Sequence, residues 1–515
     1  MKKIFLLSVC ILLLLSNNVR AQITFQKTYG GTFYDYASGV IQTADSGYIV
    51  WGFTKSFGAG DYDMYLIKTN NVGDTLWTRV ISAPNNDDRI YSVIQTADGG
   101  YVFTGGGAFL MKLDGNGNLL WKMKYELAQN IGGSSVQQTN DGGFVFVTSV
   151  FDVVWNICLF KTDSVGNIEW IKEYETQSSF AYCIRQTPDN GFVITGNGGG
   201  NNYSDALLIK TDSLGNLSWT PRTYHAATYD LGFSVLPTND GGYIIAGSSG
   251  ASSSGAVYVI KTDATGYALW SKTYGGFLWV DNEREFISME NTSDGNYFIT
   301  AARSDSFYVL KINTTGDLLW AKTYGGGGES EFAGYGQQTL DGGYVFVGST
   351  TSFGAGSMDV YLIKTDSMGN SGCYENDVLV TPVITATQTF GFLPITSSLT
   401  VDIDSTNYSM ISGATVTTIC LPTGIDKIPP VQSWSVFPNP TSGKSFINYS
   451  LSTRAAVRVE LYDMLGNKLK QLINADEDAG EHNASFDASK LANGVYLLQI
   501  RAGDQMQSQK IVVMK

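Results

Sequence analysis

Apolar and polar positions alternate along most of this chain in short runs that end at glycine-rich turns. Residues 91–121 show the pattern, because the runs YSVIQT, YVFTG, AFLMKL and LLW are separated by ADGG, GG and DGNGN. Alternation over four to eight residues is typical of strands with one buried face, and Asp-Gly or Gly-Gly pairs supply the positive φ that tight hairpins require. The segment therefore predicts four short strands.

The four-strand unit recurs seven times. Its most regular string begins at a lysine in each copy: KTNNVGDTLW at Lys68, KLDGNGNLLW at Lys112, KTDSVGNIEW at Lys161, KTDSLGNLSW at Lys210, KTDATGYALW at Lys261, KINTTGDLLW at Lys311 and KTDSMGN at Lys364. Four strands repeated at this period predict an all-β fold, a seven-bladed β-propeller with four-stranded blades, over residues 22–371.

The way the ring closes can also be inferred. The seventh copy has no fourth strand, whereas residues 23–31, ITFQKTYGG, stand alone ahead of the first copy. They match the fourth strands WSKTYGG at Trp270 and WAKTYGG at Trp320. We expect this N-terminal strand to close the last blade, which would cover an otherwise open sheet edge.

The N-terminus has the pattern of a secretory signal peptide. Two lysines precede an apolar run from Ile4 to Leu15, and small or medium residues lead to Ala21. This predicts a signal peptide over residues 1–21, with cleavage between Ala21 and Gln22. The run is too short to span a membrane, and no other stretch approaches the roughly 20 apolar residues required.

Residues 372–431 break the repeat and are rich in Thr, Ser, Val and Ile. They predict a β-rich connector, either extended β structure or a loosely packed extension. Cys373 and Cys420 lie near its ends, and a disulfide between them would contribute roughly 3–4 kcal/mol by closing the intervening loop. Cys158 and Cys183 fall in strands of neighbouring blades and are expected to be buried and free.

The last part of the chain, residues 432–515, alternates as a small immunoglobulin-like β-sandwich should. It resembles the type A C-terminal sorting domain of the type IX secretion system of Bacteroidota, in these residues: Pro438-Asn439-Pro440, Gly443, Leu461-Tyr462-Asp463, Gly466, Gly480, His482, Gly494-Val495-Tyr496, Lys510 and Lys515. The resemblance implies Sec export, passage through the type IX machinery, removal by a sortase-like peptidase, and release or attachment at the cell surface. The repeats also resemble propeller proteins exported with this domain.

Charge and composition narrow the function. The net charge is −14, from 47 acidic and 33 basic residues, which argues against nucleic acid or anionic membrane as a partner. The two histidines are His225 and His482, so a histidine-based metal site or catalytic triad has little support. We expect a monomer without a cofactor, Ca²⁺ being the one ion that the acidic loops suggest.

Comparison of the seven copies separates scaffold from site. The lysine that begins each string and an aspartate in each first hairpin occur in all copies, so they are expected to hydrogen-bond their own turns and to pair with one another. Variation concentrates between the second and third strands and between blades. Both sets of connections emerge on one face, the loop face, while the opposite turn face carries short hairpins.

The candidate ligand residues are acidic and aromatic side chains of the loop face: Asp35, Tyr36, Asp88, Trp155, Tyr203, Asp205, Tyr229, Asp230, Trp279, Glu283 and Glu331. Aromatic rings stack on sugars and carboxylates accept hydroxyl protons, so the set predicts a non-catalytic module that binds a glycan or surface polymer. For any single residue the alternative is a structural role at a strand end. A glycan-active hydrolase or lyase on this face, and an adhesive protein with a protein partner, are the other interpretations.

Overall fold

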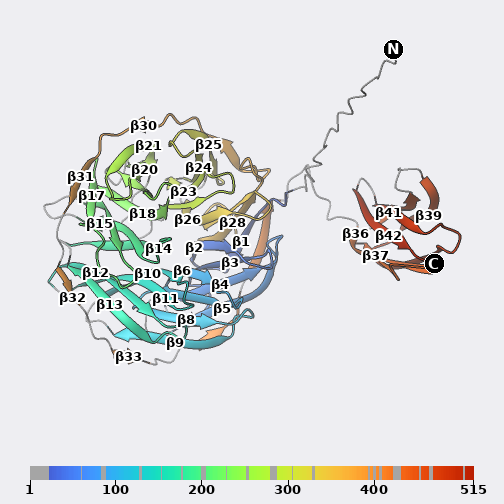
Figure 1. Cartoon of the computed structure of the whole chain (residues 1–515), viewed down its shortest axis with the longest axis horizontal. Helices are drawn as coiled ribbons and strands as arrows, with labels where there is room; N and C mark the ends of the chain where they lie inside the picture. The colour runs from blue at the N-terminus through green and yellow to red at the C-terminus, as the bar shows by residue number, and fades with distance from the viewer. Residues whose placement is uncertain are drawn as a thin grey trace, which may run out of the picture. The chain divides into compact units, whose positions relative to one another are not determined.

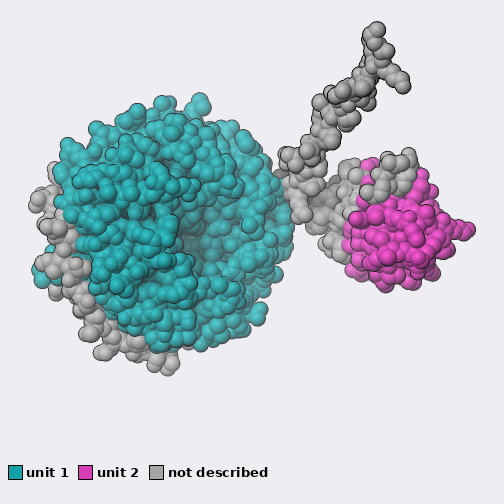
Figure 2. All heavy atoms as spheres, in the orientation of Figure 1, with its two compact units in different colours: residues 1–422 teal, residues 423–515 magenta. Residues whose placement is uncertain are grey.

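The computed structural model divides into two compact units, residues 1–422 and 423–515 (Figure 2). It describes residues 22–58, 61–82, 89–126, 130–151, 153–175, 178–198, 204–227, 229–250, 255–278, 287–303, 305–327, 331–391, 395–397, 402–404, 409–413, 415–420, 431–451, 454–462, 468–502 and 505–515. The predicted cleavage site at Ala21 lies outside this range.

The described part of the first unit consists of antiparallel sheets arranged in a ring (Figure 1), which confirms the predicted β-propeller. Seven sheets are present in this part. Six of them take four strands from one repeat copy, and the seventh takes three strands from the last copy and one from the N-terminal segment. We number the blades by copy. Blades 1 to 3 contain β2 (Asp35–Gln42), β3 (Tyr48–Thr54), β4 (Asp63–Thr69) and β5 (Thr75–Ser82); β6 (Ile90–Gln95), β7 (Tyr101–Gly105), β8 (Phe109–Leu113) and β9 (Leu119–Glu126); and β10 (Asn130–Gln138), β11 (Phe144–Phe151), β12 (Trp155–Thr162) and β13 (Ile168–Glu175).

Blades 4 to 7 follow the same order. They contain β14 (Phe180–Gln186), β15 (Phe192–Gly198), β16 (Asp205–Thr211) and β17 (Arg222–His225); β18 (Asp230–Pro237), β19 (Tyr243–Ser249), β20 (Gly255–Thr262) and β21 (Ala268–Leu278); β22 (Ser288–Asn291), β23 (Tyr297–Arg303), β24 (Ser306–Ile312) and β25 (Leu318–Tyr324); and β26 (Glu331–Gln338), β27 (Tyr344–Thr350), β28 (Asp359–Thr365) and β1 (Phe25–Gly30).

The N-terminal strand closes the ring as predicted. β1 pairs antiparallel with β28, from Phe25 opposite Lys364 to Tyr29 opposite Val360. All six residues of β1 are buried. Phe25 and Tyr29 share an apolar cluster with residues of blade 1, including Val50. The strand therefore completes blade 7 and also packs against blade 1.

The connector adds a fifth strand to every blade, a feature that its sequence pattern did not show. Its strands pair antiparallel with the outer strands in the order blade 6, 5, 4, 3, 2, 1 and 7: β29 (Glu375–Asp377) with β25, β30 (Val383–Ile384) with β21, β31 (Gln388–Gly391) with β17, β32 (Ile395–Ser397) with β13, β33 (Asp402–Asp404) with β9, β34 (Ser409–Ile411) with β5, and β35 (Thr415–Cys420) with β1. We call residues 373–420 the belt. In Figure 1 its labelled orange strands lie on the outside of the ring.

The burial of the strands explains the repeat pattern. The middle strands of a blade are covered on both faces by neighbouring blades, so β3 and β4 of blade 1 are buried at all seven positions. The fourth strand lies farther out and keeps an alternating pattern in its first half, as in β5. Apolar side chains on the covered strands supply the hydrophobic free energy that holds the ring together.

A tyrosine links each blade to the next. Its hydroxyl donates to a glycine carbonyl in the following blade at six junctions: Tyr29 to Gly73, Tyr125 to Gly166, Tyr174 to Gly215, Tyr224 to Gly266, Tyr274 to Gly316 and Tyr324 to Gly369. The exception is the junction of blades 1 and 2, where Ile81, which pairs with Met64, stands in β5 at the position of the tyrosine. There the contact with the next blade comes from Arg79, whose Nε donates to the Gly117 carbonyl at 2.8 Å. The recurring Thr-Tyr of the fourth strands is therefore a contact between blades.

The second unit is a pair of antiparallel sheets. One contains β36 (Val431–Phe437), β37 (Lys444–Leu451) and β40 (Gly480–Asp487), and the other contains β39 (Lys468–Glu477), β38 (Ala455–Tyr462), β41 (Gly494–Ala502) and β42 (Gln505–Val513). Side chains from both sheets, such as Ile447 and Leu498, form one buried apolar cluster. No helix in the described parts of the chain is long and apolar enough to cross a membrane.

Candidate functional site

The turn face repeats one ion pair in every blade. The lysine of the third strand lies close to the aspartate of the first hairpin: Lys68–Asp45 at 2.8 Å, Lys112–Asp98 at 2.7 Å, Lys161–Asp141 at 2.9 Å, Lys210–Asp189 at 2.8 Å, Lys261–Asp240 at 2.8 Å, Lys311–Asp294 at 2.6 Å and Lys364–Asp341 at 3.0 Å. These pairs agree with the expectation drawn from the repetition.

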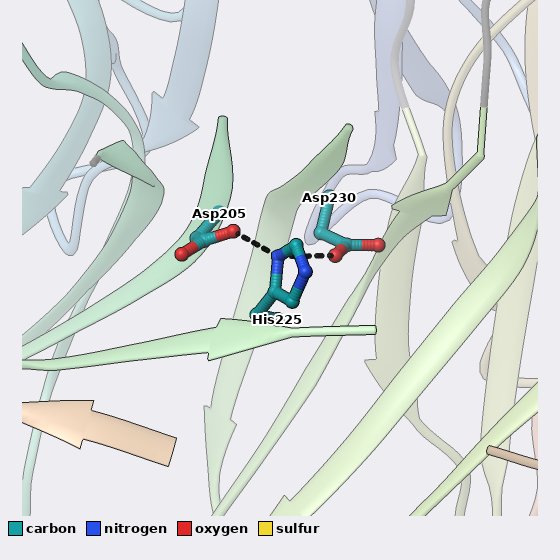
Figure 3. Close-up of side chains that lie close together, drawn as sticks. All are labelled: Asp205, His225 and Asp230. Atoms are coloured by element: carbon teal, nitrogen blue, oxygen red, sulfur yellow. Dashed lines mark hydrogen bonds and ion pairs between the residues drawn. The ribbon is translucent and has the colours of Figure 1, made fainter. Parts of the chain in front are cut away.

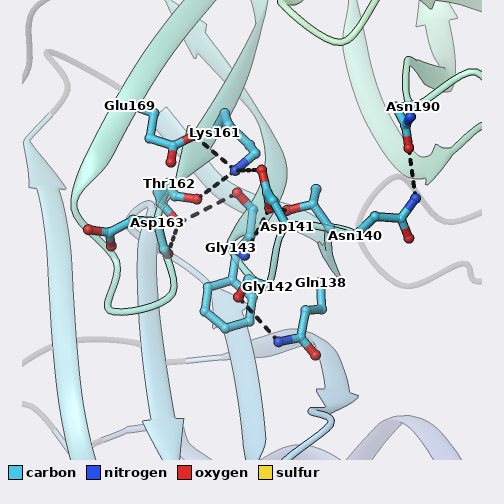
Figure 4. A network of polar contacts seen from close by, with 12 residues as sticks. Gln138, Asn140, Asp141, Gly142, Gly143, Lys161, Thr162, Asp163, Glu169 and Asn190 are labelled. Carbon is cyan, nitrogen blue, oxygen red and sulfur yellow. Dashed lines mark hydrogen bonds and ion pairs between the residues drawn. The ribbon is translucent and has the colours of Figure 1, made fainter.

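Blade 3 shows how the aspartate organises its turn (Figure 4). Asp141 Oδ1 accepts hydrogen bonds from Thr139 Oγ1 at 2.5 Å and from the Gly143 backbone N–H at 3.0 Å. Lys161 Nζ also donates to the Thr162 carbonyl at 3.0 Å. Because each of the seven repeated aspartates is engaged by its own blade, these residues serve as scaffold contacts.

On the loop face, three candidate acids are closed off from solvent. Asp35, Asp230 and Glu331 are the first residues of β2, β18 and β26, and their exposed fractions are 0%, 0% and 2%. Tyr36 follows Asp35 and is also buried, stacked against Phe53 with ring centroids 4.9 Å apart. A ligand in solution cannot reach these side chains in this conformation.

The buried acids hold the loops around them. Asp35 Oδ2 accepts from the Gly31 N–H and from Ser56 Oγ, both at 2.7 Å, and so ties the connection between blades to the loop after β3. Glu331 Oε1 accepts from Thr350 Oγ1 at 2.9 Å and Ser352 Oγ at 2.7 Å.

Asp230 makes corresponding contacts at the start of blade 5. Its Oδ2 accepts from the Ala226 and Ala227 N–H groups at 2.7 and 2.9 Å. The structural role at a strand end, the alternative considered for each single residue, therefore accounts for these three acids.

Burial also changes the protonation of these acids. Desolvation raises the pKa of Asp35 and of Asp230, and it raises the pKa of Glu331 to about 7 despite hydrogen bonds from Ser352 and Thr350. Asp359, the first residue of β28, is buried in the same way, and its pKa is raised by burial and by the charge of Asp35. The sequence analysis did not select Asp359, although its place at the start of a third strand matches that of Asp205.

The remaining candidates divide into two groups. Asp88, Tyr203, Trp279 and Glu283 lie outside the described residues and stay predictions. Trp155 is partly exposed and packs against Phe151 and Phe180, with ring centroids 5.3 and 5.2 Å away. Tyr229 is 48% exposed, and Asp205 is partly buried.

Asp205 belongs to a cluster that also contains His225 and Asp230 (Figure 3). Asp205 begins β16, His225 ends the neighbouring β17, and Asp230 begins β18 in the next blade. The register that places Ala206 opposite Tyr224 brings Asp205 and His225 together. His225 Nδ1 lies 2.8 Å from Asp205 Oδ1 and 4.0 Å from Asp230 Oδ2.

The three side chains of this cluster differ in their exposure to solvent. The side chain of Asp230 is 0% exposed, that of Asp205 15% and that of His225 36%. Tyr229 lies beside it, because its backbone forms a bridge with Ser204, the neighbour of Asp205. The cluster therefore presents an imidazole, a carboxylate edge and a neighbouring exposed aromatic residue to solvent.

The three side chains could hold a metal ion, since their ligand atoms lie within 4.8 Å of one another. An imidazole nitrogen with two carboxylates is a donor set of the zinc type, whereas Ca²⁺ takes six to eight oxygen ligands. The arrangement is also complete without an ion, because Nδ1 is already at hydrogen-bond distance from Asp205. These residues thus give no support to the calcium site that the acidic loops suggested.

The position of His225 in its repeat is a signal of its special role that catalytic motifs do not reveal. His225 follows Tyr224 at the position where Gly30, Gly275 and Gly325 follow the matching tyrosines. A Cβ added at Gly30 would lie 1.8 Å from Asp359 Oδ1 and 2.7 Å from Asp35 Oδ2. Two acids thus crowd this position at the blade 7–1 junction, whereas at the blade 4–5 junction a histidine contacts the corresponding pair.

A comparison with protein families identifies the second unit. Residues 435–514 match the model of the secretion system C-terminal sorting domain. The second unit is a sorting domain. The chain is thus a β-propeller protein exported to the cell surface by type IX secretion, as the C-terminal motifs implied.

Solved structures resemble this chain at low identity and low TM-score. PorZ of Porphyromonas gingivalis, described as an essential bacterial surface component of the type IX secretion system, has 9% identity and a TM-score of 0.40 over 94% of this chain and 60% of that one. The extracellular domain of a putative hybrid two-component system of B. thetaiotaomicron has 10% identity and a TM-score of 0.29 over 93% and 68%.

Regucalcin of Agrobacterium tumefaciens, a calcium-binding protein, has 11% identity and a TM-score of 0.30 over 55% of this chain and 91% of that one. Of the PorZ structure, which is the longer protein, the present chain spans 60%. No curated protein matches the chain.

Proposed function

We propose that the exported propeller is a non-catalytic module that binds a glycan or surface polymer through its loop face. The supporting observation is the hydrogen-bonded pair Asp205–His225 beside the exposed Tyr229. A sugar ring presents hydroxyls and an apolar C–H face, so it fits a surface that combines polar groups with an aromatic ring.

Other aromatic side chains of the loop face extend this surface. Phe33 is 58% exposed, Tyr34 42% and Phe151 37%, and all three lie in connections between blades or after a second strand. Tyr34 also stacks on the buried Tyr36, with ring centroids 6.1 Å apart, which holds it in place. Exposed rings that are already held in place lose little entropy on binding, which favours their use as ligand contacts.

The export route adds the cellular context of this proposal. A signal peptide cut after Ala21 follows from the N-terminal pattern. Sec export, processing by a sortase-like peptidase in a member of the Bacteroidota, and either release or retention at the cell surface follow from the resemblance of the C-terminal domain. The mature propeller would act as a monomer outside the cell. Among the loop-face acids that the structure describes, Asp35, Glu331 and Asp359 are buried, so these three give no separate support for catalysis.

A glycan array probed with the full chain tests the proposal, run beside an assay for released reducing sugar. We expect binding without product, and a loss of at least about tenfold in affinity for Tyr229→Ala and His225→Gln, since a stacking or hydrogen-bonding contact is worth roughly 1–2 kcal/mol. Tyr267→Ala is the matched control, because Tyr267 is 53% exposed in a hairpin of the turn face.

The other outcomes would replace the proposal. Release of sugar would favour the hydrolase or lyase, and loss of release in loop-face acid variants would then locate its site. Silence in both assays would favour an adhesive protein with a protein partner. Equal loss of binding in Tyr267→Ala and Tyr229→Ala would show that the loop face is not the binding surface.

A further inference from the structure

The belt makes a full circuit of the propeller. It begins at Cys373 beside blade 6, pairs with one blade after another in the reverse of chain order, and ends at Cys420 on blade 7. Its last strand, β35, pairs with β1, so β1 lies between β28 and β35 instead of forming an edge. The N-terminal strand that closes the ring is therefore itself covered by the end of the belt.

Both ends of the belt meet at one residue of β1. Gln26 is fully buried, and its Nε2 donates to the backbone carbonyl of Cys373 and to Ser371 Oγ, the latter at 2.7 Å. Gln26 is also the backbone partner of Cys420 in the pairing of β1 with β35. Tyr361 of β28 donates to Gln26 Oε1 and holds the amide in this orientation. The circuit thus starts and finishes at the same residue, Gln26.

The state of the cysteines indicates how the circuit is closed. Cys373 is engaged in a disulfide, whereas Cys158 and Cys183 are free and buried. Two cysteines remain as partners, Cys10 and Cys420. Cys10 falls in the predicted signal peptide, while Cys420 and Cys373 both contact Gln26.

We propose that Cys373 and Cys420 form a disulfide that closes the belt into a covalent hoop around the propeller and locks β1 in place. The two thiols lose two protons and two electrons as the S–S bond forms. A disulfide-bearing thiol oxidase of the oxidising compartment accepts the electrons by thiol–disulfide exchange.

The belt needs such a closure because its separate strands are weak. β29, β30, β32, β33 and β34 have two or three residues each, and short edge strands open readily. Much of the belt stays in contact with water, as the exposed fractions of Leu379 (103%), Ile384 (80%) and Val383 (60%) show. With both ends joined, the belt cannot fray from an end.

The hoop is independent of the sorting domain. Both cysteines precede Thr423, where the second unit begins. Removal of the second unit would therefore leave the hoop complete on the mature propeller. The proposal concerns the stability of the ring and does not depend on what the loop face binds.

Peptide mapping of the full chain, exported to an oxidising periplasm and alkylated under denaturing conditions without reductant, tests the bond. We expect one cross-linked peptide pair that contains Cys373 and Cys420, with Cys158 and Cys183 alkylated. Alkylated Cys373, or Cys373 linked to a different cysteine, would overturn the proposal.

Protease digestion of the folded protein tests whether the disulfide holds the belt and β1 in place. Reduction should increase the rate of cleavage within the belt roughly 100-fold, because it restores the chain entropy that the closed loop had removed. Cys420→Ser should be cleaved at the reduced rate with or without reductant. Cys158→Ala and Cys183→Ala, which keep both belt cysteines, are the matched controls and should respond to reductant as the wild type does.

A belt that resists protease equally before and after reduction would show that strand pairing alone holds it, which would overturn the lock. Should Cys420→Ser fail to fold, the reduction of folded wild-type protein still decides the question. Release of β1 is read in the same digest, as cleavage between Gln22 and Gly31, and we expect it to rise together with cleavage in the belt.

Discussion

Carboxylates on the two faces of the propeller have different roles. On the turn face, an aspartate whose side chain is partly exposed pairs with a lysine in each blade, as Asp98 does with Lys112. On the loop face, acids at matching strand ends are fully buried and have different partners: Asp35 bonds to a glycine N–H and hydroxyls, Glu331 to hydroxyls and Asp230 to backbone N–H groups. The same residue type is therefore repeated on one face and individually adapted on the other.

The difference is also one of protonation. Hydrogen bonds from Lys112 and Thr96 lower the pKa of Asp98 to about 2, so its charged form is favoured. Burial raises the pKa of Glu331 to about 7, so its charged form is disfavoured. Each exposed ion pair of the repeated scaffold contributes little free energy of stability. A loop that differs from blade to blade is held instead by a buried acid that hydrogen-bonds to particular partners.

Deletion of β1, the strand that closes the ring, should have the largest effect on the stability of the propeller. Deletion of residues 22–31 removes β1, whose six residues are buried, and leaves β28 and β35 without their partner. We expect the loss of a single cooperative unfolding transition by calorimetry, because blade 7 then lacks an interior strand. A chain that ends at Pro422 is the control and should keep the propeller transition, since the second unit is separate. Unchanged melting of the deletion variant would show that β1 does not close the ring.

A buried loop-face acid should have an intermediate effect that depends on pH. The pKa of Glu331 is raised from 4.5 to about 7, so the folded state binds its proton more tightly than the unfolded state. The stability linked to this group is present below pH 4.5 and is lost as the pH rises through about 7, a change of roughly 2–3 kcal/mol.

Glu331→Gln keeps an oxygen acceptor for Ser352 and Thr350, so it should remove this part of the pH dependence. The melting temperature at about pH 5 and about pH 8 measures it. We expect wild type to melt lower at the higher pH and the variant to change less. An equal change of melting temperature in the two proteins would mean that ionisation of Glu331 does not destabilise the folded state.

A single turn-face pair should have the smallest effect, in the opposite direction. Because the pKa of Asp98 is lowered from 3.8 to about 2, its stabilising contribution is present above about pH 4 and lost as the pH falls through 2. Its side chain is 63% exposed, so Asp98→Asn should cost less than about 1 kcal/mol at neutral pH. Acid unfolding of Asp98→Asn beside Glu331→Gln separates the faces, since the former should change the pH dependence of stability only between about pH 2 and about pH 4. An effect of Asp98→Asn as large as that of Glu331→Gln would contradict the distinction.

Part of the candidate site could be predicted from the residues. The comparison of copies correctly separated the lysine–aspartate pairs from the variable loops, and its ligand candidates included Asp205, Tyr229 and Asp230. It did not select His225, because a single histidine carries little weight without its partners. It also selected Asp35 and Glu331 as ligand contacts, since an acid in a variable loop does not reveal whether its carboxylate points to water or to the backbone of its own loop.

The sequence by itself determined the repeat, the four-stranded unit, the closing strand and the sorting domain, because each is encoded in a local pattern of apolar positions, turns or motifs. Only the tertiary structure decided which acids are buried, how His225 meets Asp205 and Asp230, and where the connector runs. These depend on contacts between distant segments, such as Gln26 with Cys373 and Cys420. Five of the seven belt strands have only two or three residues, too few to carry a pattern of their own, and they are strands because the outer edges of the blades offer them backbone partners.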